Sequence, residues 1–311
     1  MAMQAITAKE RSDQVVKGRT GGRFWGLRAI LSSSKATVGL FVLLFVIISA
    51  LVPDLIAPHN PNEQFLAIRL RPPLTGFGTT QQHLLGTDQL GRDILSRVIH
   101  SARTSVIIGL MVVLVSGTIG VTVGMLSGYL RGIVDDVLMR LADIQLAFPF
   151  ILLAIAIIGV LGNSVRNVIV AVGIANWVIY ARVVRGETLA VREKAYVEAA
   201  RSIGASNLRV VLLHILPNVS PSIIVISTFG VASAILAEAG LSFLGLGVPL
   251  SVPTWGSMLA DGRRFVDTSW WLAVFPGIAI FLTVLAINLL GDYLRDILDP
   301  YVQMRRALQQ Q

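Results

Sequence analysis

Residues 104–130 read TSVIIGLMVVLVSGTIGVTVGMLSGYL, a run of 27 positions without a charged side chain. A transmembrane helix needs about 20 predominantly apolar residues, so this stretch is long enough to cross a bilayer. Within it, Ser116, Gly120, Gly124 and Gly128 recur at every fourth position and place small side chains on one helical face. We expect another helix, of this chain or of a partner, to pack closely against that face.

Further apolar runs follow and precede this stretch, separated by short polar segments. Hydrophobic residues make up 54% of the 311 residues and charged residues 14%, whereas soluble domains carry about 25% charged residues. This composition excludes a disordered chain and disfavours an ordinary soluble enzyme. We therefore predict an all-α membrane protein with six transmembrane helices, at about residues 36–57, 104–130, 137–161, 167–184, 219–246 and 270–290.

The distribution of basic residues predicts the orientation. Eighteen of the 26 Lys and Arg residues fall in the two tails and in the segments after the second and fourth spans. The positive-inside rule then places both termini in the cytoplasm. The expected parts are a basic cytoplasmic tail (1–35), the first transmembrane helix (36–57), an extracytoplasmic segment (58–103), a five-helix core (104–297) and a cytoplasmic C-terminal tail (298–311).

The net charge of +8 has a simple interpretation in such a protein. The basic clusters flank apolar runs, so they favour topology and contact with anionic lipid over nucleic-acid binding. In the outer segment, residues 86–103 have apolar side chains spaced along one helical face, with Asp88 or Asp93 as the expected cap. We expect an interfacial helix there, leading into the second span.

The sequence offers no recognisable catalytic or metal-binding motif. Cysteine is absent, and the four histidines are scattered without a His-x-x-x-His pair: His59, His83, His100 and His214. None of the four lysines follows glycine in a phosphate-binding loop. We therefore expect no metal site, no catalytic residue and no ATP hydrolysis by that route in this chain.

The cytoplasmic segment between the fourth and fifth spans, residues 186–218, reads GETLAVREKAYVEAARSIGASNLRVVLLHILPN. Its pattern predicts a helix over about 187–203, an interruption at Gly204 and a second helical stretch that starts near Ser206. Pro217 marks the start of the fifth span. A short exposed helix with a glycine break can dock into the groove of a partner, although a plain surface hairpin fits the spacing as well.

Within this segment, Glu198-Ala199-Ala200, Gly204 and Leu216-Pro217 resemble the EAA loop of ABC importer permeases. The pattern of that loop is Glu-Ala-Ala, three residues, Gly, nine residues, Ile, one residue and Leu-Pro. All the spacings agree, but His214 occupies the isoleucine position and Ile215 follows it. Four other stretches resemble the C-type permease of dipeptide, oligopeptide, nickel and glutathione importers: HLLGTDQLGRD (83–93), DIQLAFP (143–149), EAGLSFLG (238–245) and NLLGDYLRDILDP (288–300). The resemblance covers about residues 36–300.

The resemblance implies a type I ABC importer permease fold in a bacterial cytoplasmic (inner) membrane. It implies a non-catalytic, multi-pass subunit that moves peptides or related small solutes by alternating access. Its expected partners are a homologous second permease, two ATPase subunits or domains that hold ATP and Mg²⁺, and an extracytoplasmic solute-binding protein. The residues that it assigns to ATPase docking are Glu198, Ala199, Ala200, Arg201, Gly204, Ala205 and Ser206.

Glu238 is a charged residue inside an otherwise apolar span, which is costly unless the carboxylate faces a cavity or a partner. One hypothesis places Glu238, Gly240, Ser242 and Phe243 along the translocation path or its outer gate; the other makes Glu238 a structural carboxylate. An ion-coupled secondary transporter is the alternative function, although the sequence shows no repeat between its halves.

Overall fold

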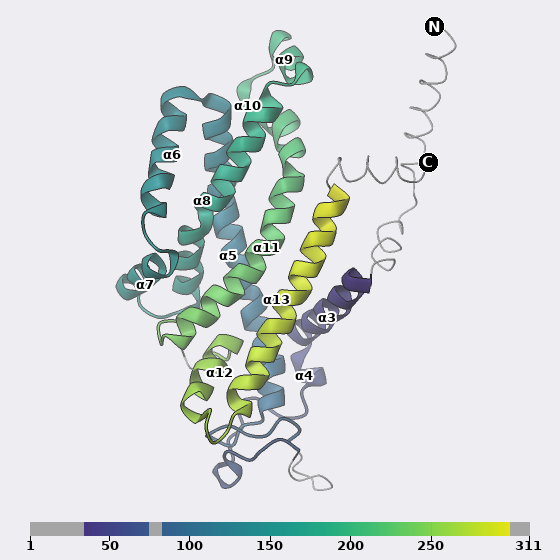
Figure 1. The fold of residues 1–311 in the computed structure, drawn as a ribbon, viewed down its shortest axis with the longest axis vertical. Helices are drawn as coiled ribbons and strands as arrows, with labels where there is room; N and C mark the ends of the chain where they lie inside the picture. The colour runs from purple at the N-terminus through teal and green to yellow at the C-terminus, as the bar shows by residue number, and fades with distance from the viewer. Residues whose placement is uncertain (1–33, 75–82, 250, 299–311) are drawn as a thin grey trace, which may run out of the picture.

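The computed structural model describes residues 34–74, 83–249 and 251–298, and these residues form a helical bundle (Figure 1). Nearly all of both predicted cytoplasmic tails lies outside these ranges. The described residues contain no β-strand, only an isolated bridge between Thr87 and Asp93. The helices are α3 (Ser34–Leu51), α4 (Pro53–Ile56), α5 (Ile94–Leu130), α6 (Gly132–Leu146), α7 (Phe150–Leu161), α8 (Val165–Arg192), α9 (Ala195–Ser202), α10 (Asn207–Val210), α11 (Leu216–Phe243), α12 (Trp255–Gly262) and α13 (Trp271–Leu298), with short turns at Leu66–Ile68, Val211–Ile215 and Arg263–Phe265.

Four helical segments are long and apolar enough to cross a membrane: α5, α8, residues 207–243 and α13. The pair α6 and α7 would make a fifth span, and α3 is a shorter apolar helix. The all-α membrane class is therefore confirmed. The six-span count and the side on which the termini lie stay predictions.

The third predicted span is bent. Instead of one helix over 137–161, α6 and α7 meet at an angle of 90°. The chain turns at Ala147, Phe148 and Pro149, where Pro149 precedes the first residue of α7. Proline has no N–H to donate and disfavours helical backbone at the residue before it, so the helix ends there.

The second predicted span begins earlier than residue 104, because α5 is continuous from Ile94 to Leu130. The side chain of Asp93 caps its first turn by accepting a hydrogen bond from the Ser96 N–H. Of the interfacial helix expected over 86–103, residues 94–103 form the first part of α5, and residues 86–93 precede that helix as a turn. Arg97 lies inside this part of α5, and its buried guanidinium pairs with Asp88 at 2.5 Å.

The small residues of α5 lie against α8. Ser116, Gly120, Gly124 and Gly128 are all buried. A Cβ added at Gly124 would lie 2.5 Å from the Ala181 carbonyl oxygen. Because this face has no bulky side chain, the two backbones approach closely and form the most extensive helix pair of the described residues.

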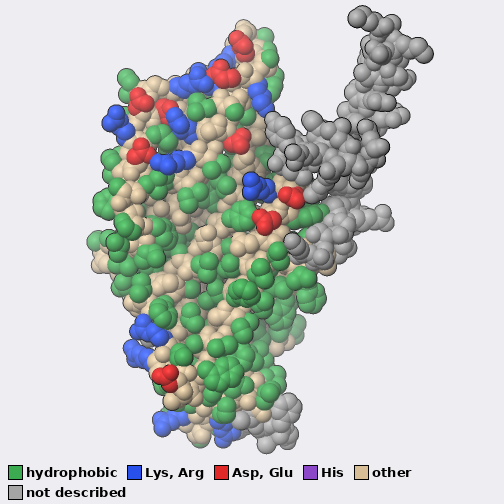
Figure 2. Space-filling model, viewed as in Figure 1, with side chains coloured by type: hydrophobic (Ala, Val, Ile, Leu, Met, Phe, Trp, Pro, Cys, Tyr) green, Lys and Arg blue, Asp and Glu red, His purple; other side chains and the backbone are tan. Residues whose placement is uncertain are grey.

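The remaining helices surround this pair. One apolar core joins α5, α7, α8 and α11, and a second joins α3, α5, α11, α12 and α13. On the face shown in Figure 2, charged side chains gather over the α9 end and in a smaller group at the opposite end. Hydrophobic side chains cover the middle, which is the surface expected of a membrane protein.

Candidate functional site

The predicted docking loop forms a projection at one end of the bundle, where α9 is the outermost element (Figure 1). The helix predicted over 187–203 is divided in the structure. Its first residues belong to α8, which continues to Arg192, and α9 begins at Ala195. After α9, Gly204 has φ +85° and open space around its Cα, as expected for an interrupting glycine. The side chain of Ser206 then caps α10.

The docking residues divide by exposure. Glu198, Ala199, Gly204 and Ser206 are exposed, whereas Ala200 is buried and both Arg201 and Ala205 are half-buried. Two apolar side chains that the motif does not include are also exposed, Ile203 at 87% and Leu208 at 69%. Between Glu198 and Arg209, the exposed surface thus carries one carboxylate, the cation of Arg209, small side chains and two large apolar groups.

Arg201 points back toward the bundle instead of outward. Its guanidinium lies 4.9 Å from the centre of the Tyr129 ring, and Arg192 lies 5.7 Å from the same ring. Arg192 also donates to the Tyr129 carbonyl, and the Tyr129 hydroxyl donates to Asn207 Oδ1 at 2.7 Å. Tyr129, near the C-terminal end of α5, is thereby bound to the segments on both sides of α9.

A π-helical turn, Val211–Ile215, joins α10 to α11 at the place where the EAA pattern departs from its isoleucine. Ile215 is fully buried in a core with Val210 and Val219, while His214 is half-buried. The extra residue in a π turn shifts the helical face by about one position. The pattern expects isoleucine at position 214, and the π turn instead places Ile215, one residue later, in the core.

The gate candidates lie at the C-terminal end of α11, far from α9. Glu238 is 1% exposed, and its Oε1 accepts hydrogen bonds from Ser242 Oγ at 2.7 Å and Thr254 Oγ1 at 2.9 Å. Gly240 and Phe243 are exposed on the same helix. The carboxylate is thus held between α11 and the residue before α12, with two side-chain hydroxyls donating to one of its oxygens.

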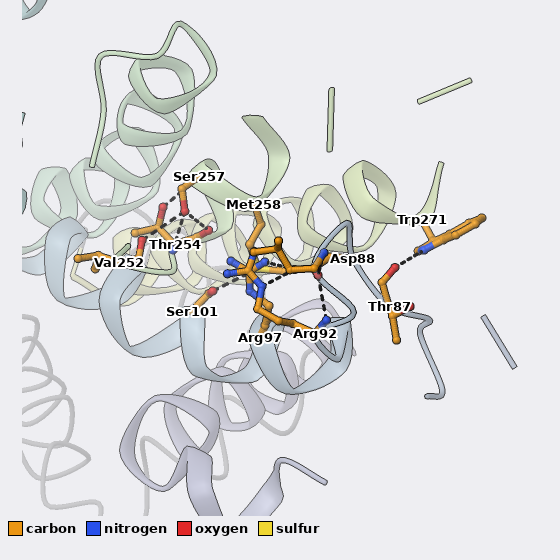
Figure 3. A network of polar contacts seen from close by, with 11 residues as sticks. Thr87, Asp88, Arg92, Arg97, Ser101, Val252, Thr254, Ser257, Met258 and Trp271 are labelled. Carbon is orange, nitrogen blue, oxygen red and sulfur yellow. Dashed lines mark hydrogen bonds and ion pairs between the residues drawn. The ribbon is translucent and has the colours of Figure 1, made fainter. Parts of the chain in front are cut away.

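Thr254 links this carboxylate to a wider polar network (Figure 3). It forms a reciprocal capping box with Ser257 at the start of α12. Nearby in the same view, Asp88 accepts hydrogen bonds from Arg92 Nε at 2.7 Å and from Arg97 Nη1 at 2.5 Å. The motif stretch 83–93 therefore forms a buried ion-paired turn that fixes the start of α5.

Asp261 of α12 lies within electrostatic reach of these arginines. Burial raises the pKa of the Asp261 carboxyl, while the attraction of Arg97 and Arg92 acts in the opposite direction. The end of the bundle opposite α9 thus concentrates charged groups that are removed from water.

Comparison with known families places these features in context. Residues 120–304 match the family described as "Binding-protein-dependent transport system inner membrane component", and residues 25–73 match the "N-terminal TM domain of oligopeptide transport permease C". The chain belongs to this inner-membrane permease family. The permease is accordingly a multi-pass protein of the bacterial inner membrane and a subunit of an ABC importer.

Individual relatives agree with this assignment. The permease is 43% identical over 277 residues to the di/tripeptide transport system permease protein DppC of Pseudomonas aeruginosa, which covers 89% of this chain and 91% of the relative. It is 43% identical over 282 residues to the glutathione transport system permease protein GsiD of Pectobacterium atrosepticum, covering 91% and 92%. Both matches extend over almost the whole permease.

A solved structure supports the fold. An inward-facing conformation of the MetNI methionine ABC transporter aligns with a TM-score of 0.54 at 17% sequence identity, over 65% of the permease and 96% of that chain. At this identity the likeness concerns the fold alone. It confirms the ABC importer permease architecture that the sequence predicted.

Sequence reasoning missed two features of the loop. The clamp on Tyr129 joins residues far apart in sequence, and no local pattern marks it. Exposed Ile203, by contrast, carried a signal, because a large apolar side chain directly before an interrupting glycine has little chance of burial. The four histidines were read as scattered, yet the fold brings two of them together beside Asp93.

Proposed function

We propose that this permease is one of two transmembrane subunits of an ATP-driven importer of short peptides, working by alternating access. The observation that supports this best is the exposed α9–Gly204–α10 projection. The substrate class is suggested by relatives named for di/tripeptides and for glutathione, itself a tripeptide. The proposed partners are a homologous permease, two ATPase subunits that hold ATP and Mg²⁺, and an extracytoplasmic binding protein.

In this proposal the projection docks into the ATPase. Ala199 and Gly204 allow a partner surface to approach closely, Glu198 supplies a charge, and Ile203 and Leu208 supply apolar area. Arg201 has a different part, holding α9 to Tyr129 so that a displacement of α9 moves the end of α5. ATP shifts the conformational equilibrium only if it binds one state more tightly.

The test is uptake into proteoliposomes that contain the permease, its second permease and its ATPases, with the binding protein added. We expect ATP-dependent uptake of labelled di- and tripeptides. Uptake that follows a proton or sodium gradient without ATP would contradict the proposal and favour an ion-coupled carrier.

The docking role has its own variant, Gly204→Asp, which we expect to insert in the membrane but to lose coupling between ATP hydrolysis and uptake. Gly132→Asp is the matched control, because Gly132 also has positive φ, 57°, and open space around it. Both changes add the same charge at a glycine with positive φ. Equal uptake by the two variants would contradict docking through Gly204.

We also propose that the end of α11 forms part of the outer gate. Exposed Gly240 and Phe243 present a surface to the second permease, and Arg263 lies 4.9 Å from the Phe243 ring centre. Behind them Glu238 holds α11 to Thr254, and Ser242 donates to the same carboxylate oxygen. Phe243→Ala should lower uptake with the complex intact, whereas Ser242→Ala should reduce the amount of assembled complex.

A further inference from the structure

Two histidines and one aspartate from separate segments converge at the end of the bundle opposite α9. His59 follows α4, His83 begins the ion-paired turn, and Asp93 caps α5. One ligand atom from each residue lies within 4.8 Å of the other two, the only such group among the described residues. The imidazole ring centres of His59 and His83 are 4.8 Å apart.

The two oxygens of Asp93 have different tasks. Oδ2 accepts hydrogen bonds from the Ser96 N–H at 2.8 Å and the Ser96 hydroxyl at 2.7 Å, which fixes the start of α5. Oδ1 lies 2.9 Å from His83 Nδ1. A cation bound by Oδ1 and His83 Nδ1 would displace the proton between them to solvent, while Oδ2 continues to cap the helix.

His59 supplies an unused donor atom in this group. Its Nδ1 is buried and has no hydrogen-bond partner among the described residues, and it lies 3.7 Å from Asp93 Oδ2. The backbone N–H of His59 donates to Ser96 Oγ at 3.0 Å, so the segment is held in place. A buried nitrogen without a partner is costly and calls for a ligand.

The negative charge of Asp93 remains available to a cation. Arg92 and Arg97 are close in the sequence, but both pair with Asp88. Asp93 has no Lys or Arg partner among the described ion pairs, only the two histidines. The group is therefore a carboxylate with two imidazoles, a set that suits divalent transition metals.

We propose that His59 Nδ1, His83 Nδ1 and Asp93 Oδ1 form a binding site for a divalent transition cation of the Zn²⁺ class. Tetrahedral Zn²⁺ with bonds of about 2.0–2.1 Å separates its ligand atoms by about 3.3 Å. The distances of 2.9 Å from His83 Nδ1 to Asp93 Oδ1 and of 3.7 Å from His59 Nδ1 to Asp93 Oδ2 bracket that separation. The bound cation would join the segment after α4 to the start of α5.

The experiment titrates Zn²⁺ into the chelator-treated importer complex in nanodiscs, purified with a tag that contains no histidine, by calorimetry. Co²⁺ absorption reports the coordination geometry. We expect one Zn²⁺ per permease and an affinity at least about tenfold weaker in His59→Gln and in His83→Gln. Asp93 is left unchanged because it caps α5.

The control is His100→Gln, since His100 lies at the same end and pairs with a different carboxylate, Asp54, at 3.0 Å. Its Zn²⁺ affinity should equal that of the unchanged permease. The proposal is overturned if His59→Gln binds Zn²⁺ as tightly as the unchanged chain. It is also overturned if the double variant of His59 and His83 retains the same single binding event.

Discussion

The two ends of the bundle differ in how far the carboxylates of their motif residues are buried. At the Asp88 end, the carboxylates of Asp88, Asp93 and Glu238 are each almost fully removed from water, and Asp88 pairs with two arginines. At the α9 end, Glu198 is exposed and so are the apolar side chains of Ile203 and Leu208. The ion pairs of Asp88 are thus completed within the chain, whereas the exposed groups near α9 are accessible to a partner.

This difference indicates which parts of the permease are fixed and which engage another chain. Removing one member of a buried ion pair is strongly destabilising, so the pairs of Asp88 with Arg92 and Arg97 should matter for the stability of the turn and the start of α5. An exposed surface has little influence on the stability of its own chain. Substitutions at the two ends should therefore separate stability from assembly.

Asp88→Asn should have the largest effect on stability. It leaves the guanidinium groups of Arg92 and Arg97 without their carboxylate in a buried site, at a cost of about 3–5 kcal/mol. The measurement is the thermal unfolding midpoint of the detergent-solubilised complex. Asp54→Asn is the control, because Asp54 is 94% exposed at the same end and should leave the midpoint nearly unchanged.

Gly124→Ala should be the next most damaging change. The new Cβ would lie 2.5 Å from the Ala181 oxygen and 2.9 Å from Val184 Cβ, so α5 and α8 must separate, at about 1–3 kcal/mol. Gly159→Ala is the control, since nothing lies within 4 Å of its added Cβ. If both variants unfold at the same temperature, close packing of the α5–α8 pair is not what stabilises it.

Tyr129→Phe should have a smaller effect at the α9 end. It removes the hydrogen bond to Asn207 Oδ1 but keeps the ring beneath Arg201, at about 0.5–1.5 kcal/mol. Coupled ATPase activity should fall together with this modest loss of stability. The same change at exposed Tyr196 should alter neither quantity, and an equal effect there would argue against the clamp.

Ile203→Ser should change stability least, by no more than about 0.5 kcal/mol, because the side chain is 87% exposed. The co-purified amount of ATPase should nevertheless fall, since the proposed contact loses apolar area. Ile133→Ser provides the comparison, with a similarly exposed isoleucine at the start of α6. Retention of full ATPase by Ile203→Ser would remove Ile203 from the docking surface.

Much of the fold was predictable because bilayers impose a simple requirement on sequence. The uncharged run 104–130 had to be a helix, and its four small residues had to face another helix. The bend at Pro149 and the extension of α5 to Ile94 were not predicted. The bend follows from the backbone restrictions of Pro149, and the extension of α5 depends on the Asp93 cap and the Asp88–Arg97 contact; apolar run lengths record neither.

The candidate sites show the same division. Spacing predicted a helical segment interrupted at Gly204, and the resemblance to the EAA loop added a docking role, which stays a prediction. Only the tertiary structure turned Arg201 toward Tyr129, buried Glu238 against Thr254 and brought His59 to His83 and Asp93. Local order along the chain fixes helices, turns and hydrophobic faces, whereas contacts between distant residues arise only when the helices pack.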